Sequence, residues 1–95
     1  MKVAVLGIGN EMKSDDGIGL LVASEFEKKI RRENETLLIN TNVPENYIGR
    51  IENFGPDILV IFDAASFGGS PGEIRIIKNE DILNFSMSTH NAPLS

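Results

Sequence analysis

The fold of this 95-residue chain is decided by one stretch of sequence, Ile58-Leu59-Val60-Ile61-Phe62-Asp63, in which five apolar residues precede an acid. An unbroken apolar run that is rich in β-branched residues is typical of a strand covered on both faces, as in a parallel sheet. Working outward, a similar run over residues 3–6 leads into a glycine-rich loop, and residues 36–39 predict another strand. We therefore expect at least three strands in one sheet.

A helical pattern follows the first strand. Ile18, Val22, Phe26 and Ile30 recur every four residues and predict an amphipathic helix that packs this face on the sheet. Charged residues, among them Glu27, fill the opposite face, which we expect to lie in solvent.

The rest of the chain continues the alternation of strands and helices. Pro44 can occupy the first turn of a short helix, and residues 73–78 alternate in part, as an edge strand does. Residues 79–85 predict a last short helix, and the tail over 87–95 has no period. The order strand-helix-strand-helix-strand implies right-handed crossovers, a parallel sheet and a single α/β domain over residues 1–95.

The composition excludes several classes of protein. Hydrophobic residues make up 41% of the chain and charged residues 24%, which is a globular mixture. The net charge of −5 argues against partners such as nucleic acid or an anionic membrane surface, and no apolar stretch approaches a membrane span. The absence of cysteine rules out disulfides, thiolate metal sites and cysteine nucleophiles. In the absence of a targeting segment, we expect a cytoplasmic protein.

The glycine loop after the first strand does not fit a dinucleotide site. The fingerprint Gly-x-Gly-x-x-Gly needs a third glycine where this chain has Met12, and an acid should end the second strand where Asn40 stands. We expect Gly7 and Gly9 instead to allow a sharp turn and a close approach to the backbone.

A phospho-accepting receiver-like signalling domain is a second interpretation. Such domains also carry an acidic pair near the first strand and an aspartate at the end of the third, so Asp63 would be the acceptor. In this chain, however, a loop separates Leu6 from the pair Asp15-Asp16, and the later strand that carries the receiver's lysine is not reached. The receiver stays open as the alternative that is not a protease.

Asp16, Asp63 and His90 suggest a third interpretation, a metal site. Ligands of open α/β sheets bind beyond the carboxyl ends of the strands, where we expect both acids, and His90 follows in a late loop. Two carboxylates about 5 Å apart repel by about 3 kcal/mol at an effective dielectric of about 20, so a proton or a cation must relieve them. Two oxygens and one nitrogen favour zinc, nickel, cobalt or iron over calcium or magnesium.

Each of these residues also has a plain structural explanation. Asp16 suits the positive end of a helix dipole, and Asp63 can end a strand by accepting from a turn amide. A single histidine such as His90 is usually a surface residue. The three residues by themselves leave both explanations open.

Six short segments stand out in a particular order along the chain. They are Gly7-Ile8-Gly9-Asn10, Asp15-Asp16-Gly17, Pro44-Glu45-Asn46, Ile61-Phe62-Asp63-Ala64, Gly69-Ser70-Pro71-Gly72-Glu73-Ile74-Arg75 and Thr89-His90-Asn91. In their order and spacing the segments resemble the hydrogenase maturation endopeptidases of the HycI/HybD type. The resemblance covers the whole chain, although no single segment would carry it.

That resemblance implies a three-layer α/β/α sandwich with a mostly parallel sheet and an antiparallel edge strand. It implies an aspartyl-type endopeptidase that removes the C-terminal extension of the nickel–iron hydrogenase large-subunit precursor after nickel insertion. Carried over by position, Asp16, Asp63 and His90 are the metal ligands and the catalytic residues, with Asp16 or Asp63 accepting a proton. Some relatives have glutamate where Asp16 stands. The nickel is expected to be presented by the precursor, and zinc or cadmium are expected surrogates.

The chain also departs from the resemblance. Relatives continue past the histidine segment with further helix and strand elements, whereas this sequence stops at Ser95. We therefore expect a domain that is incomplete at its C-terminus and that self-associates through an exposed sheet edge. A fragment that binds the metal or the precursor without cleaving is a further alternative.

Overall fold

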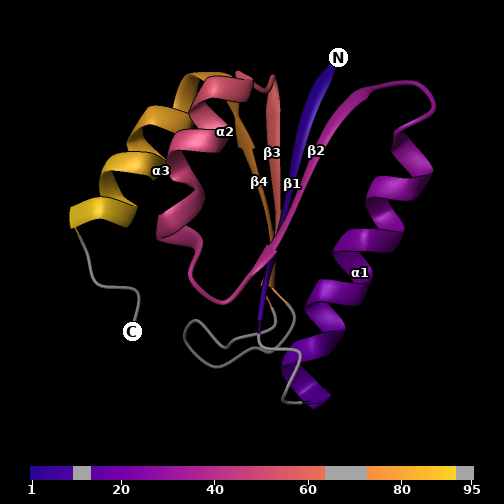
Figure 1. Ribbon diagram of the computed structural model, residues 1–95. Coiled ribbons are helices and arrows are strands. Elements are labelled where there is room, and N and C mark those ends of the chain that lie inside the picture. The colour runs from indigo at the N-terminus through magenta and orange to yellow at the C-terminus, as the bar shows by residue number, and fades with distance from the viewer. Residues whose placement is uncertain (10–13, 64–72, 92–95) are drawn as a thin grey trace.

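The protein is built on one four-stranded sheet with helices on both faces (Figure 1). The computed structural model describes the backbone of residues 1–9, 14–63 and 73–91, and within these ranges the side chains outside 14–18, 73 and 86–91. Helix α1 lies on one face of the sheet, and α2 and α3 lie on the other (Figure 1). This arrangement confirms the predicted α/β fold with three layers.

The sheet has the order β2-β1-β3-β4. Strands β1 (Lys2–Ile8), β2 (Glu35–Thr41) and β3 (Ile58–Asp63) run parallel. Strand β4 (Glu73–Lys78) pairs antiparallel with β3 at the edge, as predicted. In a doubly wound sheet of the receiver type, the fourth strand would follow a right-handed crossover and run parallel, so the antiparallel β4 argues against the receiver interpretation.

Both faces of β1 and β3 are buried, which explains the unbroken apolar runs in these two strands. In β1, Val3 and Val5 belong to the cluster beneath α1, whereas Ala4 and Leu6 belong to the cluster beneath α2 and α3. The same alternation along β3 fills both layers. A strand that is covered on each side has no reason to alternate with polar residues.

Helix α1 (Ser14–Ile30) begins where the acidic segment predicted, and Phe26 and Ile30 of the predicted face pack against the cluster on the sheet, but Val22 does not. Val22 is 42% exposed, whereas the next residue, Ala23, is fully buried. Glu27, predicted to lie in solvent, is only 6% exposed. The small Ala23 allows a closer approach to β1, and hydrogen bonds satisfy the Glu27 carboxylate, so fit between elements overrides the periodic pattern.

The segment after β2 forms a 3-10 turn, η1 (Pro44–Tyr47), and then helix α2 (Ile48–Phe54). Ile48 and Ile51 supply its buried face. Gly55 ends the helix in the left-handed conformation, with φ 63° and ψ 54°, and its amide donates to carbonyls of the last turn. Glycine adopts this conformation without a steric cost, which explains the position of the stop.

Helix α3 (Asn79–Asn91) is longer than predicted, so the expectation of a tail without structure from residue 87 is wrong over its first residues. His90 therefore lies in the last turn of a helix and not in a loop. Residues 86–91, which are polar except for Met87, have no apolar period, but a helix that is already nucleated adds residues at low cost. The predicted loop over 64–72 lies outside the described residues. Among the helices that the structure describes, none is long and apolar enough to cross a membrane.

Candidate functional site

The carboxyl ends of the three parallel strands meet at one edge of the sheet, where ligands bind in open α/β folds. Ile8 is in register with Thr41 on one side and with Asp63 on the other, so the three residues form one row across this carboxyl edge. The Gly9 amide donates to the Thr41 carbonyl at 3.0 Å and keeps the end of β1 against β2. Figure 1 shows the carboxyl edge at the lower end of the sheet, beside the beginning of α1.

Asp63 occupies the predicted position as the last residue of β3, and it is 2% exposed. Its neighbours in register are Ile8 on β1 and Glu73 on β4. Proteins retain a carboxylate that is this far removed from water where it is paired, protonated or bound to a cation. Asp63 therefore has the burial and the location of a functional acid.

The backbone of Asp16 lies in the first turn of α1, close to the same carboxyl edge (Figure 1). His90 lies in the last turn of α3, on the opposite face of the sheet (Figure 1). The structure thus brings the first turn of α1 and Asp63 to one edge. The side chains of Asp16 and His90 lie outside the described residues, and so does the remainder of the loop from Asn10 to residue 13. Among the side chains that the structure does describe, no three acids or histidines gather as a metal site.

The sequence interpretation missed the contribution of Asn40. In the sequence this residue stands out only as a departure from the dinucleotide fingerprint. In the structure its amide nitrogen donates to Ser24 Oγ at 2.9 Å and to the Leu20 carbonyl at 3.3 Å, so it links β2 to α1 near the carboxyl edge. The available signal was Asn40 itself, a polar amide near the end of a strand where the dinucleotide fingerprint has an acid.

Glu27 is a described acid whose pKa is clearly shifted by its neighbours. Its Oε2 accepts from Thr36 Oγ1 at 2.6 Å, and its Oε1 pairs with Arg31. Burial by itself would raise the pKa of Glu27, but the Thr36 hydroxyl and the charges of Arg31 and Lys28 outweigh burial and lower the pKa below its ordinary value of 4.5. The carboxylate thus stays ionised and holds α1 on the sheet.

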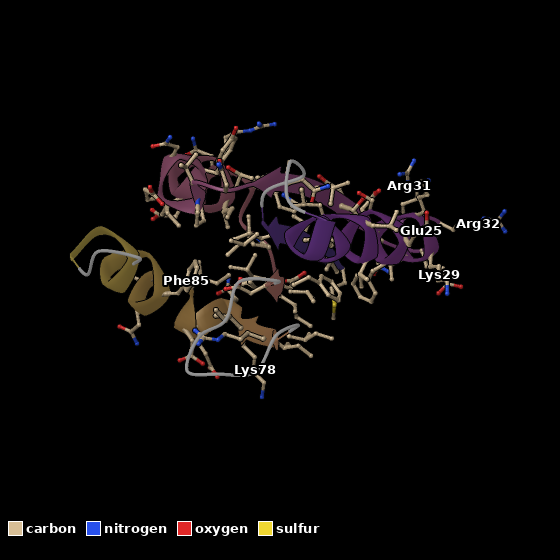
Figure 2. All side chains as sticks on the ribbon, turned by 90° about the horizontal axis from the view of Figure 1, so that it is seen from below. Glu25, Lys29, Arg31, Arg32, Lys78 and Phe85 are labelled. Carbon is tan, nitrogen blue, oxygen red and sulfur yellow. The ribbon has the colours of Figure 1, made fainter. Side chains whose placement is uncertain are left out.

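The basic residues at the end of α1 lie away from the candidate site. Figure 2 shows Lys29, Arg31 and Arg32 reaching outward at the C-terminal end of α1, with Glu25 beside them. On the other side of the sheet, Phe85 points from α3 toward the core, in agreement with its packing against the apolar cluster there (Figure 2). The charges of Lys29, Arg31 and Arg32 therefore do not line the carboxyl edge.

Comparison with known proteins gives a consistent result. A family model described as HycI, hydrogenase maturation protease, matches residues 20–95. The hydrogenase 3 maturation protease of Escherichia coli K12 is 41% identical over an alignment 96 residues long, which covers 100% of this chain and 61% of that protein. A Methanocaldococcus jannaschii protein that carries a hydrogenase maturation protease name is 36% identical over 99% of this chain and 60% of its own length.

More distant relatives are also similar to the chain. The hydrogenase expression/formation protein HupD of Rhizobium leguminosarum is 27% identical over 94% of this chain and 46% of its own length. The chain spans about three fifths of the length of the two more similar relatives. No solved structure matches it significantly.

Proposed function

This chain belongs to the hydrogenase maturation protease family, and we propose that it acts as an endopeptidase on the nickel–iron hydrogenase large-subunit precursor. It removes the C-terminal extension of the precursor after nickel insertion. It recognises the nickel through Asp16, Asp63 and His90, so the metal is part of the substrate.

The observation that carries this proposal is the position of Asp63. The residue ends the central strand β3 at the carboxyl edge, in one row with Ile8 and Thr41, and its side chain is almost completely buried. An acid at this place can meet a ligand that enters the edge of the sheet. The first turn of α1, which includes Asp16, lies beside the same edge (Figure 1).

The direction of α3 permits the participation of His90, and its last turn lies to the side of the sheet in Figure 1. The Asn79 amide donates to the Asp57 carbonyl at 2.9 Å, so α3 begins at the amino edge of the sheet. A helix of 13 residues rises about 20 Å, and a strand of six residues spans about 20 Å. Helix α3 is thus long enough to bring its last turn back toward the level of Asp63.

The chemistry of the three residues suits a transition metal that arrives with the substrate. Two carboxylates and one imidazole leave coordination positions open for the ligands that the precursor itself supplies. The same set accepts zinc or cadmium as a surrogate. Cleavage that depends on this contact occurs only on a precursor that has received its nickel.

In the reaction a water molecule adds to the scissile carbonyl carbon, the C–N bond breaks, and the leaving amine takes up a proton. Asp16 or Asp63 accepts the proton that the attacking water loses. The chain has no cysteine, so its own residues provide no thiol for a covalent route. Catalysis then depends on the two acids and on the position of the carbonyl.

Calorimetric titration with nickel, cadmium and zinc tests the recognition of the metal. We expect the wild type to bind, and we expect Asp16→Ala, Asp63→Asn and His90→Ala each to weaken binding by about tenfold or more. Asp57→Asn is the matched control, because Asp57 Oδ2 accepts from the Lys2 amide at 2.9 Å at the opposite edge of the sheet. Binding that survives all three substitutions would refute the site.

Cleavage itself is tested with the nickel-loaded and the nickel-free precursor, by mass spectrometry of the product. We expect processing of the loaded precursor only, and none with His90→Ala at an unchanged circular dichroism spectrum. Metal binding without cleavage by the wild type would leave recognition in place and refute the peptidase activity of this chain.

A further inference from the structure

We infer that Asn40 is a positioning residue that holds the first turns of α1, and with them Asp16, at the carboxyl edge of the sheet. The inference rests on the proposed role of Asp16 in metal recognition. It assigns to Asn40 no contact with the metal or with the precursor.

The contacts of Asn40 join a strand end to a helix. Asn40 is the last residue but one of β2, and its Nδ2 donates to Ser24 Oγ at 2.9 Å and to the Leu20 carbonyl at 3.3 Å. Ser24 Oγ in turn donates to the same Leu20 carbonyl at 3.0 Å. Two hydrogen bonds from Asn40 therefore tie one turn of α1 to the end of β2, and the bond from Ser24 joins their two acceptors within the helix.

Gly7 makes room for this link. Gly7 and Asn40 are register partners on β1 and β2. A Cβ on Gly7 would overlap the Oδ1 atom of Asn40 and would lie only 2.9 Å from the Cβ of Ala23 on α1. The missing side chain thus lets the Asn40 amide and helix α1 approach the same point of β1.

Among the described side chains, two polar links hold α1 on β2, and they lie at different ends of the strand. Thr36, near the beginning of β2, donates to Glu27, in the second half of α1. Asn40, near the end of β2, holds the helix at Leu20. The link through Asn40 is the one beside the candidate site.

Asp16 precedes Leu20 by four residues, so the two lie about 6 Å apart along the helix axis. An α-helix is stiff over a single turn, because each of its backbone hydrogen bonds spans that turn. A change in the position of the Leu20 carbonyl therefore moves the backbone of Asp16 with it. Partners that hydrogen-bond a metal ligand directly contribute about 10–100-fold to metal affinity or activity, so we expect an effect at the lower end of this range for Asn40, which acts through the helix.

The side chain of Asn40 is exposed. Its effect on the position of α1 can therefore be measured apart from its effect on the stability of the fold. Loss of an exposed hydrogen bond changes the free energy of unfolding little, because water can satisfy the remaining partners in the folded state. Loss of the amide should therefore disturb the site more than the fold.

Cadmium titration of Asn40→Ala, together with thermal unfolding, tests the inference. The matched control is Asn34→Ala, because Asn34 Nδ2 donates to the Ile30 carbonyl at 3.0 Å, at the other end of the same helix. We expect Asn40→Ala to weaken cadmium binding about tenfold at a nearly unchanged Tm, and we expect Asn34→Ala to bind as the wild type does. Ser24→Ala, which removes one partner of Asn40, should weaken binding in the same direction and serves if Asn40→Ala does not fold.

The possible failures can be told apart. If Asn40→Ala and Ser24→Ala bind cadmium as tightly as the wild type, the positioning role is refuted and the proposed site stands. The role is also refuted if Asn34→Ala weakens binding equally. If the wild type itself does not bind the metal, the proposed function fails instead.

Discussion

Gly7 and Asn40 face each other across β1 and β2, and the Asn40 side chain occupies the space that a Cβ on Gly7 would need. The glycine is therefore part of the strand and not of a turn, which corrects the expectation that it lets the chain turn sharply. The lack of a Cβ on Gly7 allows the close approach to the backbone that the sequence also predicts. Through this contact the end of β2, the end of β1 and the first half of α1 are packed as one unit.

Replacing Gly7 with alanine should destabilise the protein. The added methyl group would collide with Asn40 and Ala23, and we expect the free energy of unfolding to fall by about 1–3 kcal/mol in urea titrations. Gly49→Ala is the control, because no atom lies within 4 Å of its added Cβ and the residue is inside α2. That substitution should raise the stability by about 0.5–1 kcal/mol. Equal effects at both positions would contradict the steric account.

Gly55→Ala should also destabilise the protein, but for a conformational reason. No atom lies within 4 Å of an added Cβ at this position either, yet φ is 63°. A residue with a Cβ has a cost of about 1–2 kcal/mol in the left-handed region. Urea unfolding should show that loss for alanine and a smaller one for Gly55→Asn, since asparagine tolerates this conformation better. An alanine variant as stable as the wild type would argue against the role of Gly55 as helix stop.

Stability should fall on acidification, in part because of Glu27. Its pKa in the folded state lies below the ordinary value of 4.5, since the partners Thr36 and Arg31 outweigh burial. A group with a lowered pKa stabilises the fold above its unfolded pKa and loses that contribution as the pH falls through the folded pKa. Glu27→Gln should therefore lower the free energy of unfolding by about 1 kcal/mol at neutral pH. The same substitution should flatten the pH dependence of that free energy below about pH 4.5.

The control for this prediction is Glu25→Gln on the same helix. Glu25 lies 3.5 Å from Lys28 Nζ, and both side chains are largely exposed. Exposed ion pairs contribute less than about 1 kcal/mol, so stability should change little at any pH. If the free energy of unfolding, measured by urea titration, falls equally in the two variants as the pH is lowered, the buried Glu27 carboxylate is not the source of the pH dependence.

Self-association should occur through β4 and should be weakened by Ile76→Lys. Ile74 and Ile76 are 58% and 68% exposed, and their register partners Phe62 and Val60 face α1, so the α1 side of β4 is not covered by that helix. Exposed apolar edge strands pair with other chains, and an inserted lysine opposes this. Sedimentation velocity should show concentration-dependent association that Ile76→Lys reduces.

Leu83→Lys provides the comparison for that experiment, because Leu83 is 63% exposed but lies on α3, which packs on the face of the sheet opposite α1 (Figure 1). It should leave the association unchanged. A wild type that remains monomeric over the whole concentration range would disprove the prediction.

The elements with strong local signals were predictable from the sequence. The apolar run that ends in Asp63 predicted a central strand with an acid at its carboxyl end, and the structure confirms both. The partial alternation over residues 73–78 likewise predicted the edge strand. These signals are local, because burial on both faces or on one face leaves its pattern in neighbouring residues.

The tertiary structure alone decided which side of α1 is buried and what holds it there. A period of four residues places Phe26 and Ile30 correctly on the core side of α1. It does not predict that Ala23, which fits over Gly7, and Glu27, which accepts from Thr36, are buried while Val22 is exposed. The link from Asn40 to Leu20 was equally absent from any local pattern. Contacts of this kind join residues that are far apart in the chain, and whether they form depends on the distance between two packed elements, which no single segment encodes.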